Sequence, residues 1–227
     1  MLYMSTDFFM IVSMSFSHGQ TPGLSTKELI LETALELFNR DGVLQTSTRE
    51  IAEACGISQG NLTYHFARKN EIIISLFERL KESNDRIISE MAREDDFSPE
   101  NFRTGIRKKF EAMHAYRFLF LDFLNILREI ETLKTQYAKL DLQREKEFFQ
   151  ILEMLQRQNL LKKNLQVNAY TSLYRMFGIY FNFWLTDAEL RLKHGADVIG
   201  EYEETAFQFL IPYLNKKGRE MFLNRSC

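Results

Sequence analysis

The sequence predicts an all-α protein, and three observations lead to that class. Apolar residues recur at the helical spacing of three and four positions along most of the chain, whereas the apolar–polar alternation of half-buried strands is almost absent. Only 10 Gly and 3 Pro interrupt the 227 residues, which favours long helices. With 45% hydrophobic and 26% charged residues, the composition is that of a globular chain and excludes a disordered or collagen-like one.

Net charge and cysteine content exclude further classes. A formal net charge of −2 gives no global sign of nucleic-acid binding, so such a function has to rest on a local motif. The two cysteines, Cys55 and Cys227, are far apart and form neither a disulfide framework nor a zinc site by themselves.

Residues 1–24 are expected to be an N-terminal tail, or the product of a start codon assigned too early, with Met4, Met10 and Met14 as alternative starts. The apolar run in this segment has no Lys or Arg before it, and several polar residues interrupt it. It therefore fits neither a signal peptide nor a membrane span. The chain is expected to be cytoplasmic, with no membrane association.

The helices are predicted from their start and stop signals, beginning with a compact N-terminal unit over residues 25–72. Capping boxes at Ser25–Glu28 and Ser47–Glu50 open two of them, and Ser58 caps another. Gly42 and Gly56 follow the first and second helices as stop signals. The predicted helices cover about residues 26–41, 48–55, 59–65 and a linking helix over 70–93.

A second, larger helical domain is predicted over residues 98–227. An acidic, turn-prone segment precedes it, and Ser98 with Pro99 forms the cap and first position of its first helix. Residues 117–130 are apolar on nearly all sides, which predicts one buried helix. The remaining periodic segments predict helices over about residues 133–158, 167–184 and 198–214.

Residues 56–58 separate two short helices with the spacing of a helix-turn-helix. In this motif the second helix enters the DNA major groove, and here Leu62 would anchor it on the first. Gln59 and Asn61 fall on the first turn of the second helix, where amide side chains can pair with adenine edges. The positions suited to phosphate contacts are Tyr64, His65 and Lys69.

At these residues the chain resembles the TetR family of transcriptional regulators. The resemblance covers about residues 27–73, with matches at Ala34, Phe38, Gly42, Thr46-Ser47, Ile51-Ala52, Gly56, Ser58, Lys69 and the run from Gly60 to Phe66. Two positions depart from the family pattern: Thr63 stands where Tyr is usual, and Arg68 stands where a helix-capping residue is usual.

The resemblance implies a DNA-binding repressor that binds a palindromic operator as a homodimer and is released by a small-molecule effector. An activator of the same fold and a non-enzymatic helical ligand-binding or adaptor protein remain the alternatives. The DNA-binding residues that it implies, together with the motif, are Thr46, Ser47, Thr48, Gln59, Gly60, Asn61, Thr63, Tyr64, His65 and Lys69.

The charge of the predicted DNA-binding unit agrees only in part with this function. From Lys27 to Glu71 there are five Lys or Arg against seven Asp or Glu, a balance of −2. Few phosphate-binding cations imply a shallow salt dependence and weak non-specific binding. Dimerisation should therefore be needed for useful affinity.

The sequence does not predict an enzyme. The chain contains no H-E-x-x-H pair, no Gly-rich phosphate loop and no G-x-S-x-G motif. Asp122 and Glu129 are seven residues apart on one helix face, but no second group completes a catalytic pair. The sequence accordingly predicts no catalytic residues, no metal and no cofactor.

The C-terminal domain is rich in aromatic residues, as ligand cavities are. The expected effector is an apolar or aromatic small molecule. If it also carries a positive charge, Asp122 and Glu129 are the carboxylates expected to pair with it. The residues expected to form its pocket are Phe110, Met113, Asp122, Phe123, Leu127, Tyr137 and Tyr174.

Two broad apolar stripes in the last two predicted helices indicate a homodimer that closes a four-helix bundle. Burial of both stripes within one subunit is the alternative. The residues expected at the interface are Phe177, Phe181, Trp184, Tyr202, Phe209 and Tyr213.

Overall fold

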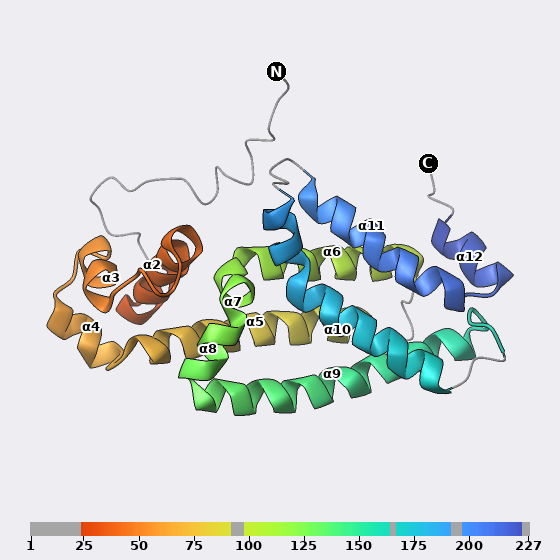
Figure 1. The fold of residues 1–227 in the computed structure, drawn as a ribbon, viewed down its shortest axis with the longest axis horizontal. Coiled ribbons are helices and arrows are strands. Elements are labelled where there is room, and N and C mark those ends of the chain that lie inside the picture. The colour runs from red at the N-terminus through yellow and green to blue at the C-terminus, as the bar shows by residue number, and fades with distance from the viewer. Residues whose placement is uncertain (1–23, 92–97, 164–166, 192–196, 224–227) are drawn as a thin grey trace, which may run out of the picture.

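The computed structural model describes residues 24–91, 98–163, 167–191 and 197–223, and these residues form an all-α protein. The predicted fold class is confirmed. Among them, the pairing of Leu161 with Leu214 is an isolated bridge and no strand is formed. Figure 1 shows the N-terminal helices gathered at one end of an elongated molecule, with the longest helices lying along the rest.

The N-terminal helices are α2 (Thr26–Asp41), α3 (Thr48–Ala54) and α4 (Gln59–His65). They are called the three short helices below, because each is shorter than the helix that follows them. Both predicted capping boxes are present. The Ser25 hydroxyl accepts from the Glu28 amide at 3.2 Å, and the Glu28 carboxylate accepts from the Ser25 amide at 2.9 Å. The box at Ser47 has the same reciprocal form. Because these bonds satisfy amides that the first turn leaves free, they determine where α2 and α3 begin.

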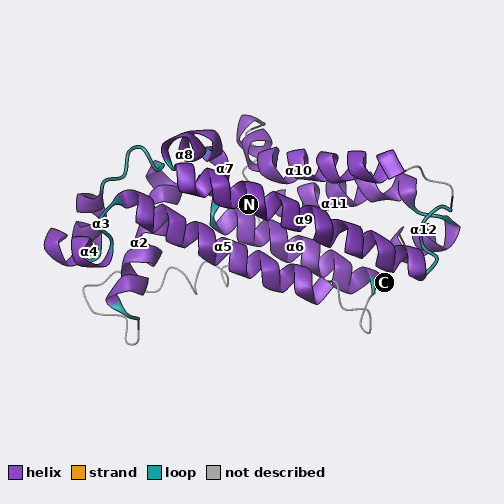
Figure 2. Ribbon diagram, turned by 90° about the horizontal axis from the view of Figure 1, so that it is seen from below, coloured by secondary structure: helices purple, strands orange, loops and turns teal. Residues whose placement is uncertain are grey.

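Helix α5 (Lys69–Met91) joins the two parts of the molecule. Its first half contributes Ile72 and Leu76 to the core of the three short helices. Its second half contributes Ile87 and Met91 to a separate core in the larger part. Figure 2 shows α5 running from the short helices alongside α6 and α9.

The larger part consists of α6 (Pro99–Ala115), α7 (Arg117–Leu121), α8 (Phe123–Glu129), α9 (Glu131–Arg157), α10 (Val167–Leu190), α11 (Val198–Leu210) and α12 (Lys216–Leu223). Its core contains the fully buried Phe110 and Trp184, whose rings meet edge to face at 5.0 Å. Helix α7 packs against both α2 and α10, so it touches both parts of the molecule.

Several features of the structure differ from the prediction, including the end of α10, which extends to Leu190 and not to residue 184. The single helix over residues 117–130 is wrong: the chain breaks at Asp122 into α7, which buries Phe118 and Leu119, and α8, which buries Ile126. The last helix ends at Leu210, because Pro212 has no amide hydrogen to continue the ladder, and a 3-10 turn over Ile211–Tyr213 follows. Helix α12 was not predicted.

Candidate functional site

Helix α4 lies at the far end of the molecule (Figure 1), and the side chains that it exposes are mostly polar. Leu62 is fully buried beneath it, and this anchor turns Gln59, Asn61 and Thr63 outward to solvent. Tyr64 is the most exposed large side chain of the helix, with 84% of its surface accessible. The N-terminus is held by the Ser58 hydroxyl, which accepts from the Asn61 amide at 3.1 Å. The helix therefore offers amide and hydroxyl groups on a surface that nothing in the described chain covers.

Some polar groups of this surface already form hydrogen bonds within the protein, and others do not. The Gln59 amide donates to the Thr48 hydroxyl at 3.2 Å, a weak contact between two exposed groups. The Thr63 hydroxyl donates to the Gln59 carbonyl within the helix at 2.9 Å. The Tyr64 ring meets the half-buried His65 ring edge to face at 5.2 Å. Asn61 is left with a side chain open to solvent, and Gly60 adds no side chain to the same turn.

Three residues expected to touch DNA are instead used inside the fold. Thr46 is buried, and its hydroxyl donates to the Gly42 carbonyl at 2.9 Å. The Ser47 side chain is taken up by its capping box. The Lys69 ammonium reaches back from α5 to the loop before α3, where it donates to the carbonyls of Val43 at 2.6 Å and Thr46 at 2.9 Å. The structure thus gives Lys69 a contact with the backbone where the sequence suggested a phosphate contact.

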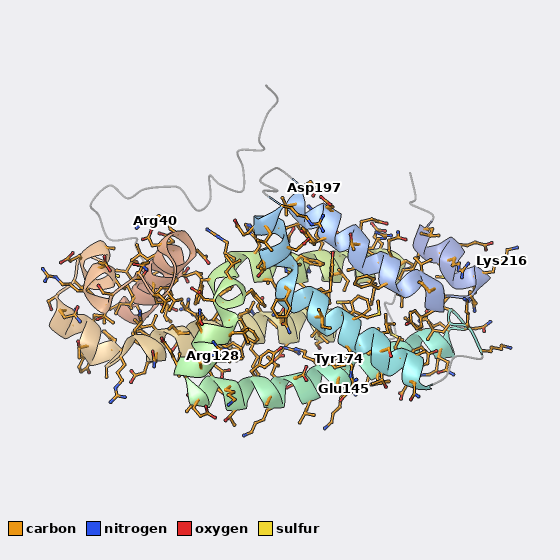
Figure 3. The ribbon with its side chains drawn as sticks, viewed as in Figure 1. Arg40, Arg128, Glu145, Tyr174, Asp197 and Lys216 are labelled. Carbon is orange, nitrogen blue, oxygen red and sulfur yellow. The ribbon has the colours of Figure 1, made fainter. Side chains whose placement is uncertain are left out.

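A cavity of about 220 Å³ lies in the larger part of the molecule, with walls from α5 to α10 and Leu210 of α11. Four of the expected pocket residues line it: Met113, Phe123, Tyr137 and Tyr174. Tyr174 extends from α10 toward α9 (Figure 3) and donates its hydroxyl to the Asp141 carboxylate at 2.7 Å. The Tyr137 hydroxyl accepts from the Asn182 amide at 2.8 Å.

The other expected pocket residues lie elsewhere. Phe110 is fully buried behind the wall, against Trp184. Asp122 stands at the break between α7 and α8, on the side of Gly42, and Leu127 packs against the core of the short helices. Glu129 is exposed. The carboxylates of Asp122 and Glu129 therefore do not line the cavity, because the break between α7 and α8 turns them outward.

The charged groups that do line the cavity come from α5, α6 and α9. Arg144 donates to Asp85 at 2.5 Å and to Glu147 at 2.7 Å. Lys109 of α6 lies over the Phe181 ring, with Nζ 3.9 Å from the ring centroid. Burial lowers the pKa of Lys109 to about 8, and the nearby Arg144 acts in the same direction while Glu147 opposes it.

Lys109 was missed from the sequence, although a signal was present. It stands three residues after Ile106 and four before Met113, so it occupies the apolar stripe of its helix. A lysine in such a position is ordinarily read as a long side chain that reaches solvent along the helix surface. Only the neighbouring helices show that this one ends at a cavity wall.

Two protein-family models match the chain. The model described as bacterial regulatory proteins of the tetR family matches residues 30–76, and the TetR model described as a bacterial transcriptional repressor matches residues 79–222. The second match alone covers more than half of the chain. The chain belongs to the TetR family.

Individual TetR-family relatives match over shorter stretches. The regulator TtgR of Pseudomonas putida is 32% identical over 74 residues, which are 33% of this chain and 35% of that protein. The regulator AcrR of Shigella flexneri is 42% identical over 59 residues, 26% of this chain and 27% of that protein. The chain thus spans only about a third of the length of these curated relatives.

Solved structures of the TetR family share the fold over nearly the whole chain. A TetR-family regulator from Marinobacter aquaeolei VT8 gives a TM-score of 0.79 at 24% identity, covering 88% of this chain and 96% of that one. The complex of SmeT with triclosan gives 0.61 at 17% identity, covering 85% and 93%. At these identities the likeness establishes the fold alone.

The surface expected to form a TetR-family dimer is only partly available. Trp184 and Tyr202 are buried within the subunit, so neither can face a partner. Phe177 and Phe181 line the cavity, while Phe209 and Tyr213 are half-buried against the same core. The apolar residues that α10 does expose are Met176, Ile179, Phe183 and Leu190.

Within the described residues, no group of three or more His, Cys, Asp or Glu side chains is placed to hold a metal ion. Over the same part of the chain, no helix has the length and apolar character needed to cross a membrane.

Proposed function

We propose that this chain is a homodimeric transcriptional repressor that binds a palindromic operator through α4 and releases it when a small molecule occupies the cavity. The observation that carries the proposal is the polar face of α4, held outward by the buried Leu62 in a chain of the TetR family. Gln59 and Asn61 are the proposed base-reading residues. Amide side chains on the first turn of such a helix recognise adenine by paired hydrogen bonds.

The exposed stripe of α10 supports dimerisation. Met176, Ile179, Phe183 and Leu190 are separated by three, four and seven residues, a heptad-like spacing that places them on one face. Ile179 is 65% exposed and Leu190 79% exposed in the single subunit. A two-fold contact along α10 would cover these side chains and place two α4 helices on the same side of the dimer.

Helix α7 supplies the connection between the cavity and α4. Leu119 and Phe120 of α7 line the cavity. On the side toward α2, the Asn39 amide donates to the Ala115 carbonyl at 2.7 Å, and the Phe118 amide donates to the Asn39 side-chain oxygen at 3.1 Å. A ligand that displaces α7 therefore moves α2, against which α3 packs, and α4 packs in turn against α3. Release of DNA follows if the ligand binds more tightly to the displaced arrangement.

Selection of binding sequences from random duplex DNA, followed by gel-shift titration, tests the proposal. We expect an inverted repeat whose half-sites lie about 34 Å apart. Asn61→Ala should cost about 1–3 kcal/mol on the best site and relax the base preference at one position of each half-site. Asn125→Ala, which removes an exposed amide from α8, is the matched control and should change nothing. Selected sites without two-fold symmetry would contradict the proposal.

A further inference from the structure

Lys109 is a cation that forms no ion pair with a described carboxylate, in a cavity whose walls are mostly apolar. Its side chain forms part of the cavity wall, and its ammonium faces the Phe181 ring at 3.9 Å. Among the described residues, no carboxylate lies within ion-pairing distance of Lys109 Nζ. A ring face offsets only part of the cost of removing an ammonium from water. The depressed pKa of Lys109 is consistent with this incomplete compensation.

The other charges at this end of the cavity already neutralise one another. Arg144 is paired with Asp85 and Glu147, and Lys81 donates to Asp85 at 3.1 Å. These two cations and two carboxylates balance. Asp141 is exposed at the outer edge and accepts the Tyr174 hydroxyl. Lys109 is therefore the one inward-facing charge, among the described groups of the cavity, that remains to be matched.

We infer that the cavity takes an amphipathic monoanion, an aliphatic or aromatic carboxylate whose head pairs with Lys109 and whose tail lies along the apolar walls. The inference rests on the proposed function of the cavity as the effector site. A single ammonium matches a single negative charge, whereas a phosphate dianion would remain partly unpaired in an apolar surrounding. A cationic ligand is disfavoured because it would meet Lys109, while Asp122 and Glu129 lie outside the cavity.

The walls next to Lys109 suit the tail of such a molecule. Phe148 and Phe177 line the cavity from α9 and α10, with their ring centroids 6.0 Å apart, and Leu152 continues the apolar wall along α9. Contact with these side chains supplies affinity that does not depend on the head group. The two contributions can therefore be separated by changing the head group while the tail is kept constant.

Isothermal titration calorimetry with three probes that share a ten-carbon chain makes this separation: decanoate, 1-decanol and decyltrimethylammonium. The wild-type chain should bind decanoate most tightly. Lys109→Met should weaken decanoate binding by about 30-fold or more and leave 1-decanol unchanged, because the loss of one member of a desolvated charge pair affects only the charged probe. Lys108→Met removes an exposed neighbouring lysine that is paired with Glu90, so this control should bind decanoate as the wild type does.

The pH dependence gives a second test on the unmodified chain. Because the pKa of Lys109 is about 8, the free cavity loses its positive charge as the pH rises through that value. A bound carboxylate raises the pKa of Lys109, so decanoate binding at about pH 8 should take up protons, which buffers of different ionisation enthalpy reveal. Arg144, Glu147, Asp85 and Lys81 face the same region as paired groups. Burial and its bond to Asp141 raise the pKa of Tyr174, so it stays neutral throughout.

Equal binding of 1-decanol and decanoate, preference for the cationic probe, unchanged decanoate binding by Lys109→Met, or no binding of any probe would each overturn the inference. Gel-shift titration of the wild-type chain without probes tests the proposed function separately. If the wild-type chain bound no operator in that titration, the repressor proposal would be wrong. The calorimetric comparison would still decide whether the cavity binds a carboxylate.

Discussion

Replacing Lys69 by methionine separates a structural role from a DNA-contacting one. The Lys69 ammonium makes two charge-assisted hydrogen bonds, to the Val43 and Thr46 carbonyls. Bonds of this kind contribute about 1.5–3 kcal/mol each when they are well shielded. Lys69 is only half-buried, so water can replace part of the loss. We therefore expect the free energy of unfolding to fall by about 1.5–3 kcal/mol in total, which is less than the simple sum.

The same variant should weaken binding to all DNA sequences, since the loop that orients α3 loses its tether. The salt dependence of binding should not change, because no phosphate contact is removed. A true phosphate contact would lower the slope of log K against log salt concentration by about 0.9. Chemical denaturation and gel-shift titrations at several salt concentrations measure both quantities. Arg68→Met, at the exposed neighbouring position, is the control and should leave stability unchanged. Unaltered stability together with a shallower slope for Lys69→Met would refute the structural role.

Three further substitutions test other parts of the structure. Ile179→Glu should produce a monomer in analytical ultracentrifugation, whereas Leu142→Glu, at a similarly exposed leucine of α9, should leave the dimer intact. A dimeric Ile179→Glu protein would exclude this face. Gly218→Ala should destabilise the chain by about 1–3 kcal/mol, because the new Cβ would lie 2.4 Å from the Leu160 carbonyl oxygen. Thermal melts measure this loss, and an unchanged melting temperature would show that α12 shifts freely. Asn39→Ala should preserve operator affinity but reduce the ability of a bound effector to release DNA, measured by gel shift with and without ligand. Full release by this variant would place the coupling elsewhere.

Local signals in the sequence were sufficient for the N-terminal helices. The capping boxes at Ser25 and Ser47 and the glycine after α2 act within a few residues, so the pattern alone determines the element. Gly42 confirms this directly, since it adopts φ 85°, a value that side chains rarely allow.

The larger part was predicted less well because its features depend on distant contacts. An apolar run from residue 117 to 130 does not distinguish one helix buried on all sides from two short helices that bury different faces. The apolar stripe on α10 likewise did not reveal that Trp184 turns inward while Phe183, its neighbour, turns outward. The roles of Lys69 and Lys109 were hidden for the same reason, since each depends on carbonyls or rings from another part of the chain.

Helix α5 contributes side chains to both hydrophobic cores, which couples the folding of the two parts. A unit cut after residue 72 would lose Ile73, Leu76, Phe77 and Leu80, all of which are buried against the short helices. The hydrophobic core of the three short helices is therefore completed by a helix that the rest of the chain holds in place. Loss of the C-terminal core would free α5 at one end and so reduce the stability of the other. The two parts are expected to unfold in one cooperative transition, and a single calorimetric peak would be its signature.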